Sequence, residues 1–354
     1  MNRFRASVLA GGMIAALTMT ACQVRRAPAP ETTRQLRVTS VRRIIDQPAL
    51  SPAAWSPDGT RFAFGDAAGI YVASPGGPVR RIGPGGVITA LAWSKPLDLL
   101  AVIDRGALWV MRPDGSRRHR LDVPGFTTWA AWSPGGDRLA AVLRRAGQDG
   151  PRFELWLTSP DGRFRRFVHR APSGMVMRDL QWFPDSLYLF YGLSRAGEDV
   201  IAEAWRVRVS YPDRQRIAIP GGALQVRLAP TGRAMAYLTG DALDDGRGQV
   251  VTSRLDGTAR VTLTAHAGRY SGLAWSPQGD KLAFAELIDE AHAEVWIADG
   301  DGPGRLLVHD YALEFSDPSI ALSAAWAPDG RRLLFGTNSG TFQGPIWIAT
   351  LERR

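Results

Sequence analysis

A short motif that returns every 40 to 50 residues or so constrains this chain more than any other feature. Its best copy is Ala54-Trp55-Ser56-Pro57-Asp58-Gly59. Six degraded copies are centred on Trp93, Trp132, Trp182, Leu228, Trp275 and Trp326. Proline presets φ at the first corner of a tight turn, and glycine accepts the left-handed exit. Each copy therefore predicts a short strand that ends at the large apolar residue, then a turn, then a second strand.

The rest of each unit predicts two more strands. A third strand carries an aromatic residue at a matching place, namely Tyr71, Trp109, Trp156, Trp205, Trp296 and Trp347, with Val250 in the fifth unit. An arginine-rich fourth strand follows, as in residues 79–82. One such unit cannot bury its apolar faces alone, so the copies must pack against one another in a ring. The prediction is an all-β chain that forms a seven-bladed β-propeller with four-stranded antiparallel blades.

The two ends of the repeat region predict how the ring closes. Residues 38–45 resemble a spare fourth strand, while the last unit stops after a third strand at residues 346–349. Pairing these segments completes the seventh blade and removes an exposed edge. We therefore expect one propeller over residues 38–354. A six-bladed ring is the alternative if the degenerate unit at Leu228 is not a blade.

The amino-terminal segment predicts export. Arg3 and Arg5 precede a small apolar stretch that is too short for a permanent membrane helix. Residues 1–21 resemble a bacterial lipoprotein signal peptide, because Ala21 stands before Cys22, the only cysteine. The resemblance implies cleavage before Cys22 and lipid attachment to its sulfur, with residues 22–37 as a flexible linker. The alternative is an ordinary signal peptide with an incidental cysteine. We expect a cell-envelope protein anchored to the outer face of the cytoplasmic membrane or to the outer membrane.

The positive charge of the chain does not indicate nucleic-acid binding. The formal net charge is +9, and every basic residue except Lys95 and Lys281 is arginine. These arginines are spread over the repeats and lie on no helical motif, so we expect no nucleic-acid partner. On outer strands they discourage edge-to-edge aggregation. A basic belt for anionic lipids or wall polymers is the alternative.

Lengthening loops predict where a partner binds. Segments such as 193–203, 286–293 and 337–345 are longer than their counterparts in the first two units, and long loops on a rigid scaffold commonly carry binding sites. We expect a partner-binding face over blades four to seven, and solvated loops without a partner are the alternative. The candidate binding residues are Glu198, Asp199, Asp241, Asp245, Tyr270, Asp289, Glu290, Asp310, Tyr311, Phe315 and Phe342.

Familiar catalytic and metal-binding motifs are missing from the sequence. No Gly-x-Ser-x-Gly or His-Glu-x-x-His motif occurs, so we expect no catalytic residue, metal or cofactor. Histidines from different blades could still converge on the central channel of a propeller. His169, His266, His292 and His309 thus stay open as an alternative metal site.

The repeat is similar to that of the TolB family, whose unit reads near Trp-Ser-Pro-Asp-Gly-x-x-Leu-Ala-Phe. Residues 55–64, 132–141, 275–284 and 326–335 match it best. The resemblance implies a propeller that binds an envelope protein. We therefore expect a monomeric, lipid-anchored scaffold without catalysis that binds a protein or polymer. The alternative is a propeller enzyme, a lyase or hydrolase that acts on a sugar or lactone at the channel mouth.

Overall fold

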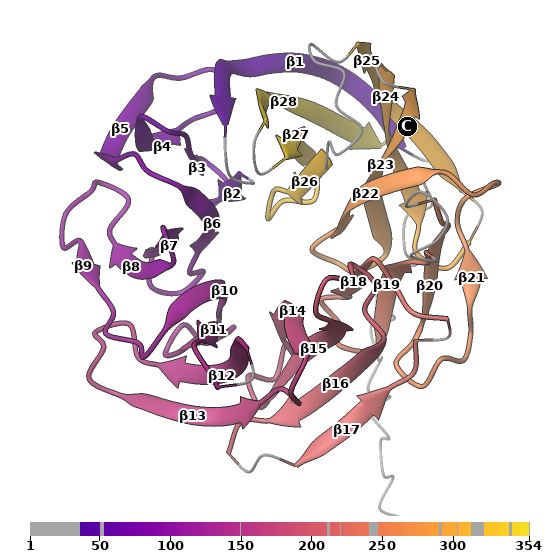
Figure 1. The fold of residues 1–354 in the computed structure, drawn as a ribbon. Coiled ribbons are helices and arrows are strands. Elements are labelled where there is room, and N and C mark those ends of the chain that lie inside the picture. The colour runs from indigo at the N-terminus through magenta and orange to yellow at the C-terminus, as the bar shows by residue number, and fades with distance from the viewer. Residues whose placement is uncertain are drawn as a thin grey trace, which may run out of the picture. The chain divides into compact units, whose positions relative to one another are not determined.

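The computed structural model describes residues 36–49, 53–148, 150–210, 213–219, 221–240, 247–289, 292–302, 304–312, 322–339 and 342–353. These residues form seven four-stranded antiparallel sheets that stand around a ring (Figure 1). The seven-bladed prediction is confirmed, and the six-bladed alternative is wrong because the unit at Leu228 forms a full sheet. The expected signal segment and Cys22 lie outside the described residues.

We number the blades in chain order, with the innermost strand first. Blade one contains β2 (Ala54–Trp55), β3 (Phe62–Gly65), β4 (Gly69–Ala73) and β5 (Val79–Pro84). Blade two contains β6 (Ile88–Trp93), β7 (Leu100–Asp104), β8 (Ala107–Met111) and β9 (His119–Arg120). Blade three contains β10 (Phe126–Trp132), β11 (Leu139–Arg145), β12 (Arg152–Thr158) and β13 (Arg165–Arg170).

The remaining blades follow the same plan. Blade four contains β14 (Met175–Trp182), β15 (Tyr188–Arg195), β16 (Glu203–Arg208) and β17 (Arg214–Ile217). Blade five contains β18 (Gln225–Leu228), β19 (Ala234–Leu238), β20 (Val250–Arg254) and β21 (Val261–Thr262). Blade six contains β22 (Arg269–Trp275), β23 (Lys281–Asp289), β24 (His292–Asp299) and β25 (Arg305–Ala312). Blade seven contains β26 (Leu322–Trp326), β27 (Arg332–Ser339), β28 (Phe342–Arg353) and β1 (Leu36–Ala49).

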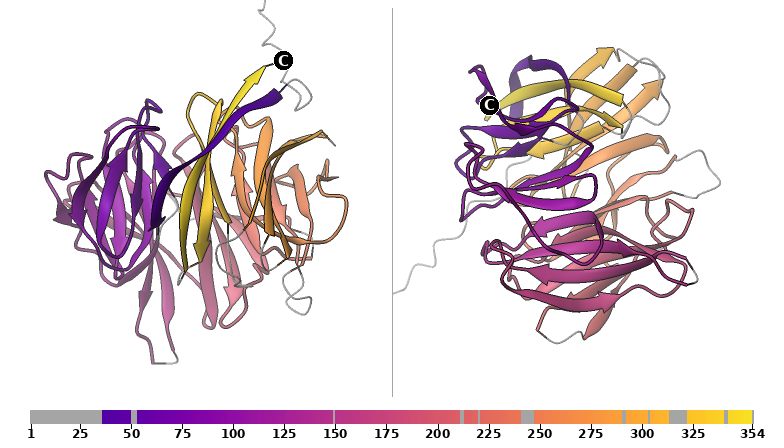
Figure 2. Two further views of the ribbon diagram at one scale, coloured as in Figure 1. Left: turned by 90° about the horizontal axis from the view of Figure 1, so that it is seen from above. Right: turned by 60° about the vertical axis from the view of Figure 1, so that its left-hand side comes forward.

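Strands from both ends of the chain build blade seven, as the sequence predicted. β1 pairs antiparallel with β28 from Leu36↔Arg353 through Ile45↔Ile346. The two strands run side by side in Figure 2. Arg37 adds an exposed ion pair with Glu352 at 3.1 Å. The ring is thus closed by backbone pairing between its first and last strands, and β1 covers the edge that β28 would otherwise expose.

The turn motif is held by its own side chains. In blade one the Ser56 hydroxyl donates to the Asp58 carboxylate at 2.6 Å and accepts the backbone N–H of Arg61 at 2.9 Å. Gly59 adopts φ 68°, the left-handed region that glycine enters without strain. The hydrogen bond from Ser56, followed by that from the Thr60 N–H, lowers the pKa of Asp58 to about 2. These contacts explain why serine, aspartate and glycine recur together.

The hydrophobic core is divided among the interfaces between neighbouring blades. Seven clusters of buried side chains occur in the described residues, and each joins one blade to the next. The cluster between blades seven and one, for example, contains Phe62, Phe64 and Leu334, none more than 1% exposed. Because every blade buries its two faces against two neighbours, the ring is stable only when closed.

The recurrent tryptophan links each of several blades to the blade before it. Its indole Nε1–H donates to a backbone carbonyl of the previous blade. The acceptor is the residue immediately before that blade's own tryptophan, or before Leu228 in blade five. The pairs are Trp55 with Ala325, Trp132 with Ala92, Trp182 with Ala131, Trp275 with Arg227, and Trp326 with Ala274, at 3.0 to 3.2 Å. Trp93 differs, because its indole donates to Asp98 within blade two.

Leu228 cannot make this link, and polar side chains of blade four replace it. The Gln181 amide donates to the Val226 carbonyl at 2.9 Å and accepts the Leu228 N–H at 2.9 Å. The Asp179 carboxylate accepts the Val226 N–H and pairs with Arg227, both at 2.8 Å. A bulge in β14 and a φ of 51° at Asp179 aim these groups at β18. Blade five thus joins blade four without a tryptophan link.

Candidate functional site

The strand order places two kinds of connection on one face of the ring. A blade's second-to-third-strand hairpin and its connection to the next blade lie at the same end, because neighbouring strands are antiparallel. We call this end the hairpin face. The Ser-Pro-Asp-Gly turns lie at the other end. Partner-binding segments expected from the sequence therefore share the hairpin face.

The hairpin face is taller over some blades than over others. The second strand has 4 residues in blade one (β3) and 5 in blades two and five (β7, β19). It has 7, 8, 9 and 8 residues in blades three, four, six and seven (β11, β15, β23, β27). All second strands begin soon after the turn motif, so the extra length projects beyond the hairpin face, as the side view in Figure 2 indicates.

Two segments expected as loops are strands instead. β23 and β24 stay paired up to Asp289↔His292, and β27 and β28 up to Ser339↔Phe342. The expectation of loops over 286–293 and 337–345 was therefore wrong in form. Apolar residues such as Leu287 continue the pattern of the strand, and cross-strand pairing satisfies backbone groups that a loop would expose. In blades six and seven, the projections are therefore paired strands over their described residues.

Arg178 gathers two candidate residues of blade four. Its guanidinium lies 3.0 Å from the Asp199 carboxylate and donates to the Glu198 carbonyl at 3.1 Å. It also donates to the Ser194 hydroxyl at 2.9 Å. The Asp199 side chain is 86% exposed. It is thus fixed on one side and open to a partner on the other.

Blade six places Asp289 of β23 and Asp310 of β25 next to His292 of β24. Asp289 is the register partner of His292, and the His292 imidazole contacts the Asp310 carboxylate. Both aspartates are exposed. Tyr270 is 5% exposed, with its hydroxyl donating to the His266 carbonyl at 3.3 Å. Burial, and then the nearby Glu286 carboxylate, raise the pKa of Tyr270. Tyr270 is therefore a buried residue of blade six and offers a partner little accessible surface.

The other candidates are described in part or not at all. Asp241, Asp245, Glu290 and Phe315 lie outside the described residues, and for Tyr311 and Phe342 only the strand position is described. The structure therefore assigns no side-chain contact to them.

The histidines left open as a metal site are scattered. His292 belongs to a third strand and His169 and His309 to fourth strands, so none of these three lies on an innermost strand. Among the described residues, no group of three or more His, Cys, Asp or Glu side chains is placed to hold a metal ion. Nor does any described segment form a helix with the length and apolarity needed to cross a bilayer.

Arginines on or just before fourth strands cover third-strand tryptophans, a role that the sequence did not reveal. The guanidinium carbon lies over the indole ring in three blades, in the pairs Arg118–Trp109 at 3.8 Å, Arg214–Trp205 at 5.0 Å and Arg305–Trp296 at 5.6 Å. Such cation–π contacts contribute about 0.5–1 kcal/mol at exposed sites. The rim arginines thus help to hold the outer strand onto its blade.

A second repeated pair was also missed. Three blades carry a glutamate two residues before the third-strand tryptophan, and its carboxylate accepts the indole N–H. The pairs are Glu154–Trp156 at 3.0 Å, Glu203–Trp205 at 2.9 Å and Glu294–Trp296 at 3.0 Å. The repeated Glu-x-Trp triplet was the signal that could have revealed them.

Glu154 is the most buried of these glutamates. Its side chain is 3% exposed and pairs with Arg170 at 2.8 Å and Arg145 at 3.3 Å. Burial pushes the pKa of Glu154 up, but the hydrogen bonds from Trp156 and the two arginines outweigh it and hold the pKa below its usual range. Glu154 is therefore a charged, structural anchor of blade three.

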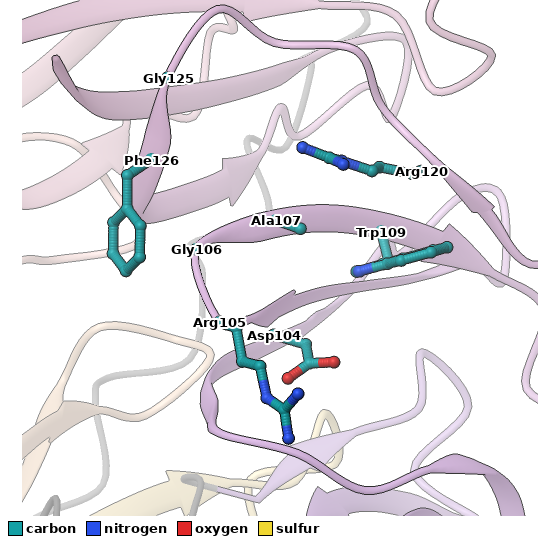
Figure 3. A pocket seen from close by; sticks show the side chains of 8 residues that line it. All are labelled: Asp104, Arg105, Gly106, Ala107, Trp109, Arg120, Gly125 and Phe126. Carbon is teal, nitrogen blue, oxygen red and sulfur yellow. The ribbon is translucent and has the colours of Figure 1, made fainter.

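Blade two lacks the glutamate and has a pocket there. Ala107 stands two residues before Trp109, and a pocket of about 430 Å³ opens between β8, β9 and the start of β10. Arg120 and Phe126 also line it, as Figure 3 shows. The corresponding place in blade four is a pocket of about 340 Å³ that contains Glu203 and Arg216. The two pockets occupy equivalent positions on the hairpin face and differ in whether they hold a carboxylate.

Solved structures are similar to this chain in fold. An oligogalacturonate lyase in complex with manganese superposes with a TM-score of 0.66 at 13% identity, covering 89% of this chain and 95% of the lyase. An oligogalacturonate lyase from Vibrio parahaemolyticus gives 0.63 at 10% identity, with 89% and 96% covered. Neither a protein-family model nor a curated protein matches the chain.

TolB is a further structural relative. The TolB of Acinetobacter baumannii superposes with a TM-score of 0.54 at 14% identity, covering 75% of this chain. This chain spans 64% of the length of that TolB. Identities this low establish the architecture alone. The described residues of the chain thus form a seven-bladed propeller. In overall fold the chain is similar to TolB and to oligogalacturonate lyases.

Proposed function

We propose that this chain is a lipid-anchored scaffold of the cell envelope, without catalysis, that binds a protein or polymer at the hairpin face of blades four to seven. One observation carries the proposal: paired strands extend at this face in blades six and seven, and exposed carboxylates lie there at Asp199 of blade four and at Asp289 and Asp310 of blade six. Groups that strand pairing or ion pairs already hold in place lose little conformational entropy when a partner binds. The similarity of the repeat to that of TolB supports a partner in the envelope.

The test combines a charge-removing variant with a matched control. Asp199→Asn, Asp289→Asn and Asp310→Asn are combined, and partners are recovered by crosslinking in intact cells and identified by mass spectrometry. The control combines Asp114→Asn, Asp161→Asn and Asp256→Asn, which remove equal charge from turns on the opposite face. We expect the first variant to lose a partner that the control retains. A partner list unchanged by the first variant would refute the binding face.

The lipid anchor needs its own measurement. Mass spectrometry of the amino-terminal peptide is expected to find acyl chains on Cys22, and Cys22→Ser is expected to release the protein from membranes. More than one acyl chain anchors a protein stably, since each buried methylene contributes about 0.8 kcal/mol. An unmodified Cys22 in membrane-extracted protein would contradict this part of the proposal.

A propeller enzyme acting on a sugar is the alternative function. It is supported by the fold similarity to an oligogalacturonate lyase in complex with manganese. Incubation with oligogalacturonate and Mn²⁺ separates the two functions, because a lyase forms a carbon–carbon double bond that absorbs ultraviolet light. We expect no such absorbance from the scaffold, and steady turnover would favour the enzyme.

A further inference from the structure

The pocket of blade two lacks one group that its sister blades supply. In blades three, four and six a glutamate carboxylate accepts the indole N–H of the third-strand tryptophan. In blade two the equivalent position is Ala107. No partner for the Trp109 indole N–H occurs among the described residues. Figure 3 shows the indole nitrogen turned toward the side of Ala107. The pocket therefore presents a hydrogen-bond donor at the place where a carboxylate sits in three sister blades.

Two arginines, Arg105 and Arg120, line the same pocket as this donor. Arg120 is the register partner of Trp109, and its guanidinium reaches back over β8 toward the pocket (Figure 3). Neither Arg120 nor Arg105 forms an ion pair with another described residue, and Arg144 lies over the Phe126 ring at 5.2 Å. Asp104 is the one acidic residue that lines the pocket, and it accepts the Val87 N–H at 3.1 Å. The balance of charge favours an anion.

Aromatic surface lies beside the charged groups. Phe126 is 44% exposed at the edge of the pocket, and Arg118 covers one face of the Trp109 indole at 3.8 Å. Ligand pockets typically combine apolar walls with a few placed polar groups. A volume of about 430 Å³ admits a molecule of one or two rings. The ligand should thus carry its negative charge next to a ring or an apolar surface.

We propose that the blade-two pocket is a carboxylate-binding site, in which the ligand's carboxylate takes the place of the missing glutamate. It accepts the Trp109 indole N–H and pairs with Arg120, while its ring or apolar part lies against Phe126. A carboxylate, with two acceptor oxygens in one plane, fits a donor pair formed by an indole and a guanidinium. Sugar acids and acidic side chains of peptides share this chemistry.

The Trp109 indole N–H gives a direct readout. Protein labelled with ¹⁵N-tryptophan has 12 indole signals at most, and Trp109→Phe assigns the one needed. Four probes are titrated: glucuronate, glucose, N-acetyl-Glu-Phe-amide and N-acetyl-Gln-Phe-amide. We expect at least one acid to shift the Trp109 signal and neither neutral analogue to do so. The acid that shifts it at the lower concentration identifies the source of the carboxylate as saccharide or peptide.

Two variants test the assigned groups. Ala107→Glu supplies an internal carboxylate and is expected to move the Trp109 signal without ligand and to abolish the response to acids. Arg120→Gln is expected to weaken binding roughly tenfold or more, as the loss of a charge-assisted hydrogen bond does. Arg216→Gln is the matched control, because Arg216 is the register partner of Trp205 in blade four.

Three results would overturn the site. The first is that no acid shifts the Trp109 signal. The second is that a neutral analogue shifts it as much as its acid. The third is that Ala107→Glu or Arg120→Gln binds as the wild-type protein does. Because these readouts concern blade two alone, they are independent of partner binding over blades four to seven.

Discussion

Replacing Gln181 by leucine should weaken the one blade junction that has no tryptophan. The change removes the bond from the Gln181 amide to the Val226 carbonyl and the bond that it accepts from the Leu228 N–H. Val226 is 0% and Leu228 9% exposed, so water cannot replace these bonds well. Each net hydrogen bond contributes about 1–1.5 kcal/mol, which gives a loss of about 2–3 kcal/mol in the free energy of unfolding. For a domain of this size the Tm should fall by about 3–6 °C.

Thermal and urea denaturation followed by circular dichroism measure this loss. Gln278→Leu is the control, because Gln278 is exposed at a turn and makes no hydrogen bond among those described. We also expect Leu228→Trp to restore part of the loss in Gln181→Leu, because the new indole can reach the carbonyl of residue 181 as the other tryptophans reach theirs. Equal stability of Gln181→Leu and Gln278→Leu would refute the reasoning that the amide replaces the tryptophan link.

Two further predictions concern buried charge. Burial, and then the charge of Arg214, lower the pKa of His169 from 6.5 to about 4, so below pH 6.5 the unfolded chain binds a proton first and the fold loses stability until pH 4. When the pH falls from 7.5 to 4.5, the free energy of unfolding of His169→Phe, measured by urea denaturation, should therefore decrease by about 2 kcal/mol less than that of the wild-type protein. An equal decrease in both proteins would contradict the assignment. Glu154→Leu leaves the Trp156 indole and two arginines without their carboxylate, and should cost about 3 kcal/mol in the same assay. The change Glu352→Leu, at a carboxylate that is 55% exposed, should cost less than about 1 kcal/mol.

Much of the fold could be predicted because its causes are local and repeated. Ser56, Asp58 and Gly59 form a turn through contacts within six residues, and seven copies of such a turn leave few architectures open. The closure of the ring followed from counting strands at the two ends. The bulge at Asp179 could not be predicted in this way, because it serves a neighbouring blade that lacks a tryptophan.

The candidate site was harder to predict for a physical reason. Whether a segment such as 286–293 is a loop or a hairpin depends on cross-strand pairing, which composition does not reveal. Tyr270 was a candidate binding residue, yet it is only 5% exposed. The pocket of blade two arises from an absent side chain, and Ala107 has meaning only beside Glu154, Glu203 and Glu294 in their folded positions.

A cysteine pair across β1 and β28 tests ring closure most directly. Arg37 and Glu352 are register partners with half-exposed side chains, so Arg37→Cys and Glu352→Cys in a Cys22→Ser background place two thiols on paired strands. Paired antiparallel strands bring Cα atoms to within disulfide range. Under mild oxidation, mass spectrometry after digestion should find a disulfide within one chain that joins residues 37 and 352. Free thiols, or disulfides formed only between chains, would contradict closure of the propeller by its own two ends.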